Sequence, residues 1–217
     1  NQESHVLLAV GVSIDHVIYY YYPEVNNDEN RYFNFYSQLV ERIAHLAAQW
    51  MAAGFCHGVL NTDNMPITGE SFDYGPYAFI PTYDPKFIAA YFDYGGRYSY
   101  GNQPFICRLN LELLQIPLSL VIPNSDLEAA LAQFDDYYTF YYQNLMLNKL
   151  GFNNLPPKLA NELITQTIDL LQESQFNYHQ FFSELAIQFN HGWYQDHKII
   201  LENIDIKYSE LEKWQKL

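Results

Sequence analysis

Residues 57–64 (HGVLNTDN), followed after a short interval by residues 72–75 (FDYG), are the part of the sequence that says most about the fold. Protein kinases have a catalytic loop of the form H-R-D-x-x-x-x-N and a later D-F-G motif whose Asp binds magnesium. His57 and Asn64 keep this eight-residue spacing, and D-Y-G at 73–75 stands where D-F-G is expected. The third position is Val59, which cannot accept a proton, and an acid appears instead at Asp63. The stretch therefore predicts a kinase-like loop with its acid at Asp63 instead of at the third position.

The segment between the two motifs, residues 65–72 (MPITGESF), reads as two short strands around a turn at Thr68-Gly69, because glycine adopts the positive φ that hairpin turns need. A hairpin brings its ends together, so Asn64 and Asp73 are expected to face each other and to offer oxygen ligands to one cation. Mg²⁺ prefers a few carboxylate or carbonyl oxygens, with water and phosphate completing its octahedron. The expected ion is Mg²⁺, with Mn²⁺ as the alternative.

A longer pattern surrounds these motifs. The run from Trp50 to Met65 (WMAAGFCHGVLNTDNM), together with FDYGP at 72–76, YDP at 83–85 and GRYSYGNQP at 96–104, resembles the selenoprotein O family. The resemblance is dense from about residue 22 to residue 110 and thin beyond it. Members of that family have a kinase-like fold and act as protein adenylyltransferases, which move AMP from ATP onto hydroxyl side chains.

The resemblance implies a role for each candidate site residue. Asp63 would accept the proton, Asn64 and Asp73 would hold the metal, and Asp73 would also lie near the phosphates of the nucleotide. The implied partners are ATP and protein substrates with Ser, Thr or Tyr hydroxyls. Relatives of this kind are cytoplasmic in bacteria and mitochondrial in eukaryotes, and we expect a cytoplasmic protein here.

The implied fold is mainly α with a short β-hairpin, formed by residues 1–217 as a single domain. It corresponds to the larger, C-terminal lobe of a kinase-like fold. The smaller lobe of a kinase supplies a glycine-rich loop, a strand lysine and its glutamate partner. The sequence contains none of these, so we expect the ATP-binding lobe to lie outside this chain and the chain alone to be inactive.

Two other functions remain open at this point. One is an ATP-dependent phosphotransferase of the small-molecule kinase type, whose loops also begin His-Gly, although Val59 occupies the place of its base. The other is a non-catalytic helical pseudokinase module that kept the motif. Residue chemistry does not separate the adenylyltransferase from the phosphotransferase, since both transfer reactions need metal-held phosphates and differ in which phosphorus is attacked.

Composition limits the partners further. The chain has 217 residues, of which 49% are hydrophobic, enough for a sizeable core. A net charge of −14 argues against nucleic acid and against an anionic membrane surface, because both require basic protein surface. Two cysteines are too few for a disulfide framework.

Hydrophobic spacing predicts helices along most of the chain. Leu39, Ile43, Leu46, Ala47 and Trp50 form one apolar stripe that ends at Gly54. The other expected helices cover residues 5–22, 86–92, 105–114, 126–150, 158–174 and 177–190, with a less regular stretch and a polar helix after residue 191.

Overall fold

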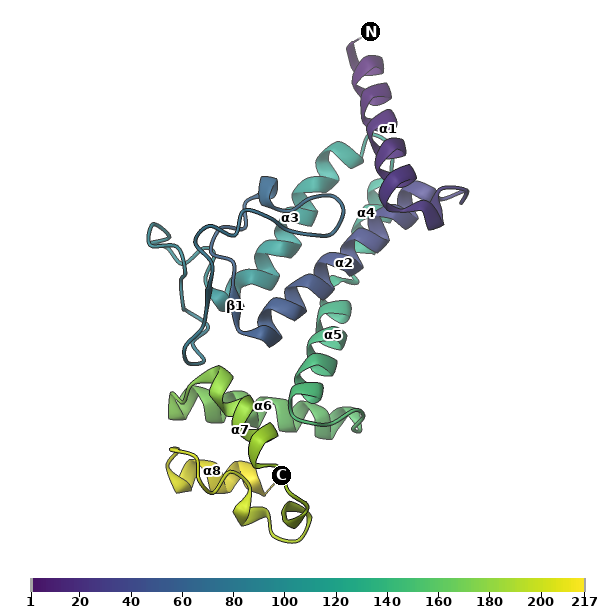
Figure 1. Cartoon of the computed structure of the whole chain (residues 1–217). Helices are drawn as coiled ribbons and strands as arrows, with labels where there is room; N and C mark the ends of the chain where they lie inside the picture. Colours follow the sequence, from purple (N-terminus) through teal and green to yellow (C-terminus); the bar gives the residue numbers. More distant parts are fainter. Residues whose placement is uncertain (1, 217) are drawn as a thin grey trace.

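The computed structural model describes the backbone of residues 2–216 and the side chains of residues 8–207, 209 and 211–216. In this part of the chain the α-helices are α1 (Gln2–Tyr21), α2 (Arg31–Ala53), α3 (Gln103–Leu118), α4 (Asn124–Leu131), α5 (Phe134–Lys149), α6 (Pro157–Ser174), α7 (Tyr178–Gln188) and α8 (Tyr208–Gln215). Helices α1–α4 form one group, and α5 connects it to α6–α8 at the opposite end of the molecule (Figure 1). The long irregular stretch between α2 and α3 lies beside these two helices.

Helix α2 is the central element, and the apolar stripe predicted from the sequence is its buried face. Leu39, Ile43 and Ala47 are almost fully buried, and Trp50 is 7% exposed. The helix ends at Gly54, which adopts a left-handed conformation with φ of 67°. This conformation favours glycine because it has no Cβ, so the predicted end of the helix is confirmed.

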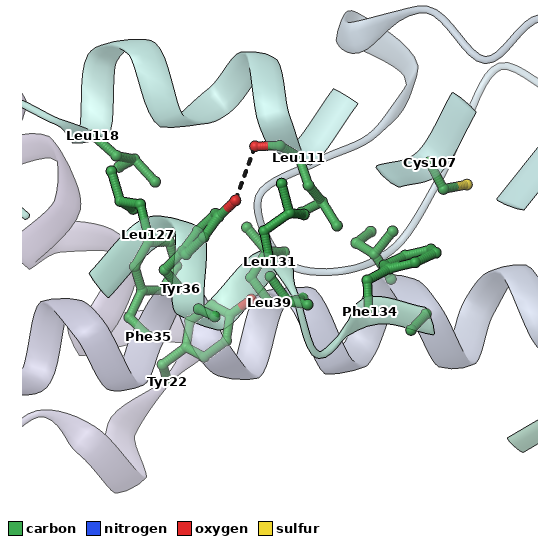
Figure 2. Packing of buried hydrophobic residues seen from close by; sticks show 14 of the residues in the cluster. Tyr22, Phe35, Tyr36, Leu39, Cys107, Leu111, Leu118, Leu127, Leu131 and Phe134 are labelled. Atoms are coloured by element: carbon green, nitrogen blue, oxygen red, sulfur yellow. Dashed lines mark hydrogen bonds between the residues drawn. The ribbon is translucent and has the colours of Figure 1, made fainter. Parts of the chain in front are cut away.

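The first hydrophobic core lies between α2 and the helices α1, α3 and α4 (Figure 2). Tyr22, Phe35 and Tyr36 are fully buried in it. The Tyr36 hydroxyl donates a hydrogen bond of 3.0 Å to the Leu111 carbonyl of α3, shown as a dashed line in Figure 2. Burying a tyrosine requires such a partner for its hydroxyl, so this bond fixes the distance between α2 and α3 as well as filling the core.

A second core is built mainly from the end of α2 and the helices α5–α8. Met51, Cys56, Tyr178 and Phe181 are buried in it. Tyr138 of α5 packs against both cores. The residues that follow α2 therefore contact the C-terminal helices directly.

Most of the predicted helices are present. Helix α1 ends before Pro23, and α6 and α7 lie within two residues of their predicted bounds. Helix α3 continues past Leu114 and includes Pro117 in its last turn. The single helix predicted over residues 126–150 is wrong: α4 and α5 are separate, although the backbone stays helical in φ and ψ at Ala132 and Gln133 between them.

The hairpin predicted over residues 65–72 is also wrong in its strands. The described strands are β1 (Phe55–Cys56) and β2 (Ala78–Phe79), which pair antiparallel across the whole intervening segment. A turn is present at this point, centred on residues 67 and 68, one position earlier than predicted: the Gly69 N–H donates to the Pro66 carbonyl at 3.1 Å. The carbonyls beside it are bound by side chains from other parts of the chain, however. Tyr22 donates to the carbonyl of residue 67, and Arg42 donates to that of residue 68, so no strand ladder forms.

The short helix predicted over residues 86–92 does not form either. Asp84 begins a turn, in which its carboxylate accepts from the Lys86 N–H at 2.8 Å. The Phe87 carbonyl then accepts from the Tyr100 N–H at 2.8 Å instead of from a residue four positions later. A helix needs that internal bond to propagate, so it stops after one turn.

None of the helices in the described part of the chain is both long enough and apolar enough to cross a membrane.

Candidate functional site

His57 is the buried centre of the candidate site. Its ring Nδ1 accepts from the Val59 N–H at 3.4 Å, so the ring proton lies on Nε2, which is 3.1 Å from the Phe72 carbonyl. Burial lowers the pKa of His57, while its backbone hydrogen bonds and the charge of Asp73 oppose the shift. The imidazole is therefore a neutral residue that joins the two motifs, which agrees with a structural role and not with that of a general base.

Ser71 completes this connection. Its Oγ lies 3.0 Å from His57 Nε2 and donates to the Asn64 carbonyl at 2.8 Å. The Phe72 N–H also donates to the Asn64 carbonyl, at 3.4 Å. The two ends of the segment predicted to close on itself are thus adjacent, although they are joined by side-chain and single backbone bonds and not by strands.

Asn64 is held in a fixed orientation within this closure. Its side chain is 5% exposed, and its Nδ2 donates to the Val59 carbonyl at 2.9 Å. Among the described residues no hydrogen bond is made to its Oδ1. An amide anchored through its nitrogen, with its oxygen unused, offers one oxygen ligand of the kind that a hard cation prefers.

The two candidate acids lie on either side of this amide in the sequence. Asp63 is exposed and belongs to the 3₁₀ turn Thr62–Asn64. Asp73 is also exposed and follows directly after the loop closure at Phe72, with φ of 58°. A left-handed backbone is uncommon for a residue with a side chain, and such strain concentrates at functional sites.

Two side chains from α3 hold the backbone of the loop, and neither was singled out from the sequence. Gln103 accepts from the His57 N–H through Oε1 and donates to the Phe55 carbonyl through Nε2, both at 2.8 Å. Asn110 donates to the Leu60 carbonyl at 3.0 Å. The two residues are seven positions apart, which places them on one face of the helix. The feature of the sequence that could have identified them is a pair of amide side chains within an apolar stripe.

A hollow of about 680 Å³ opens beside the closure, lined by Arg42, His45, Ser71, Phe72 and Tyr74 among others. Its lining does not include Asp63, Asn64 or Asp73.

The residues fit a metal ion bound by few protein ligands. Across the described residues, no group of three or more His, Cys, Asp or Glu side chains forms a metal site. Any ion held here would depend on one amide and one carboxylate, together with water or phosphate. That is how Mg²⁺ is usually bound in enzymes that act on nucleoside triphosphates.

Comparison with known proteins finds relatives in several bacteria that share one name. A protein of Trichormus variabilis is 57% identical over 193 residues, which cover 89% of this chain and 40% of the relative. A protein of Synechocystis is 51% identical over 221 residues, covering 98% and 46%. One from Vibrio cholerae is 42% identical over 172 residues, covering 79% and 35%. Each is named Protein nucleotidyltransferase YdiU, and the chain spans less than half the length of each.

The family follows from a second comparison. Residues 7–217 match the family model described as Protein adenylyltransferase SelO. The chain therefore belongs to the SelO family, and the resemblance seen in the sequence is confirmed. The assignment to the larger lobe of a kinase-like fold stays a prediction.

Proposed function

We propose that this chain carries the metal-holding and proton-accepting part of a Mg²⁺-dependent protein adenylyltransferase, with Mn²⁺ as an alternative ion. The reaction transfers AMP from ATP to the hydroxyl of a Ser, Thr or Tyr in a protein substrate. Membership in the SelO family supports the class of reaction. The observation that carries the proposal is the loop closure, in which Ser71 and the Phe72 N–H bind the Asn64 carbonyl and His57 contacts Ser71 and the Phe72 carbonyl.

In this proposal Asn64 and Asp73 bind the ion, which supplies positive charge next to the phosphates. Asn64 offers its unused Oδ1, and Asp73 offers an exposed carboxylate one residue beyond the closure. Asp73 would also lie near the phosphates of a bound nucleotide. Gln103 and His57 do not touch substrate and serve to fix the backbone between the two ligands.

Asp63 is the proposed proton acceptor. The substrate hydroxyl oxygen forms a bond to the α-phosphorus of ATP, the bond from that phosphorus to the pyrophosphate oxygen breaks, and the hydroxyl proton passes to the Asp63 carboxylate. Pyrophosphate leaves with its electron pair, so charge and atoms balance. Asp63 is exposed and therefore accessible to a protein substrate.

The rest of the nucleotide site is proposed to come from the other part of a longer protein. The relatives are more than twice as long as the stretch they share with this chain. Cationic groups that bind the triphosphate are needed because this chain has a net charge of −14.

The experiment uses a full-length chimera in which this chain replaces the matching part of the Trichormus relative. It is incubated with ATP, Mg²⁺ and a mixture of protein substrates, and the products are measured by intact mass. The expected addition is one adenylyl group per modified hydroxyl. An added phosphoryl group would instead identify the phosphotransferase.

Three variants of the chimera test the roles. Asp73→Asn should abolish Mg²⁺-dependent transfer, and Asp63→Asn should lower kcat by about 10²–10⁴-fold, the usual contribution of a general base. Asp136→Asn changes an exposed acid on α5 and should leave transfer unchanged. If all three variants behave like the parent, the site assignment is wrong and a non-catalytic module becomes the better account.

A further inference from the structure

The carboxyl end of α2 is held by three side chains from other elements, which we call the α2 clamp: Tyr100, Lys149 and Tyr178. The Tyr100 hydroxyl donates to the Met51 carbonyl at 2.5 Å. The Tyr178 hydroxyl and Lys149 Nζ both donate to the Ala52 carbonyl, at 2.9 and 2.7 Å. The last carbonyls of a helix have few internal partners, so the clamp binds the Ala52 carbonyl and adds a second bond to the Met51 carbonyl, which also accepts from the Gly54 N–H.

Lys149 is the unusual member of the clamp. Its Nζ lies 3.9 Å from the centre of the Phe182 ring and 4.5 Å from that of the Tyr178 ring. Burial lowers its pKa to about 8, because a charge in apolar surroundings is poorly solvated. An apolar side chain of similar length would fill this space without that cost. The ammonium adds a charged donor at the negative end of the α2 dipole and a cation above two rings.

Tyr178 adds a packing constraint at the same point. A Cβ on Gly54 would lie 2.8 Å from the Tyr178 ring, so this ring is in direct contact with the residue that ends α2. The Tyr178 ring therefore restrains both the position and the direction of the chain where it leaves α2.

The clamp is only a few residues from His57, and the backbone between them is bound at several points. The Gly54 carbonyl accepts from the Ile80 N–H at 2.8 Å. The Phe55 carbonyl and the His57 N–H are both bound by Gln103. We expect a displacement at Ala52 to be transmitted to His57, because these bonds restrain the backbone at Gly54, Phe55 and His57.

We propose that Lys149, acting with Tyr178, is a positioning residue that couples the C-terminal helices α5 and α7 to the loop carrying Asp63 and Asn64. The relevance of Lys149 to adenylyl transfer rests on the proposed function. The effect of Lys149 on the loop does not rest on it, so the positioning role and the proposed function can be refuted separately.

The first test is hydrogen exchange on the 217-residue chain. In Lys149→Met, amides of residues 57–64 should exchange about ten-fold faster, the effect of losing one charge-assisted hydrogen bond from local stability, while amides of α4 keep their rates. Lys149→Arg, which retains charge and donors, should restore slow exchange. Lys158→Met changes an exposed lysine on α6 and is the matched control.

Tyr178→Phe keeps the ring on Gly54 and removes only the hydroxyl, so it decides the question if Lys149→Met does not fold. It should speed exchange in the same loop. The inference is overturned if residues 57–64 keep their rates in the folded variants, or if α4 accelerates equally, which would mean general destabilisation.

The second test measures kinetics in the chimera. Lys149→Met should lower kcat with little change in KM for ATP, since the loop and not the nucleotide contacts is displaced. If KM rises and kcat is unchanged, the positioning role is refuted. A chimera without any transfer activity would contradict the proposed function, and the exchange result would still decide this inference.

Discussion

Replacing Gln103 with Met should destabilise the chain by about 3 kcal/mol. Gln103 is fully buried, and its amide bridges the Phe55 carbonyl and the His57 N–H with two bonds of 2.8 Å. A buried polar group that loses its partner costs about 1–3 kcal/mol, so two such groups cost about 2–6 kcal/mol. Methionine fills similar space and recovers part of this by burying apolar surface. The expected loss of about 3 kcal/mol is a large part of the free energy of unfolding of a whole domain, which is typically about 5–15 kcal/mol.

The assay is urea unfolding followed by circular dichroism, with the free energy of unfolding taken from midpoint and slope. Gln172→Met, at an exposed position on α6, is the matched control and should change stability by less than about 0.5 kcal/mol. A Gln103→Met variant within that same range would refute the reasoning, because the loop backbone would then have other partners. Gln103→Glu should be at least as damaging, since it retains the acceptor but buries a charge and loses the donor.

Three further predictions concern the same region. Gly54→Ala should lower the free energy of unfolding in urea by more than about 2 kcal/mol, because a left-handed alanine alone costs about 1–2 kcal/mol and its Cβ would meet Tyr178. As a control, Gly11→Ala in open space on α1 should raise it by about 0.5–1 kcal/mol. Burial lowers the pKa of His57 below its ordinary 6.5, so the unfolded chain binds more protons at this residue than the folded chain. The free energy of unfolding should therefore fall as pH drops below 6.5, and His57→Asn should make it depend less on pH in this range. Burial lowers the pKa of Lys149 from 10.5 to about 8, so the unfolded chain binds more protons at this residue between pH 8 and pH 10. The free energy of unfolding in urea titrations should therefore rise over this range, and the rise should be absent in Lys149→Met.

The sequence predicted those features whose bonds are local. The buried stripe of α2 and its end at Gly54 follow from spacing and from the φ that glycine permits. The turn beside Gly69 followed for the same reason, although it lies one position earlier than predicted. The meeting of Asn64 with the FDYG motif followed from loop closure alone. The convergence of the Asn64 and Asp73 side chains on one ion remains a prediction.

The failures occur where backbone groups bind distant residues. Phe55 pairs with Phe79, and no periodicity within a two-residue strand could indicate this partner. The Phe87 carbonyl is bound by the Tyr100 N–H, which ends a helix that the local pattern of Asp84 and Pro85 favours. In each case a long-range bond of ordinary strength replaced an equally good local one, because tertiary packing determined which group was nearer.

This exchange of local for distant bonds also explains why the candidate site has so little regular structure. Between α2 and α3 the backbone is held by turn bonds of its own and by side chains from elsewhere, with Tyr22 and Arg42 on the turn and Gln103 and Asn110 on the loop. In such a loop the Asn64 amide is anchored through Nδ2 on the Val59 carbonyl, which leaves its Oδ1 without a hydrogen bond from the described residues. The geometry of the site therefore depends on residues that never contact a ligand, and substitutions on the inner faces of α2 and α3 should change it as strongly as substitutions of the loop itself.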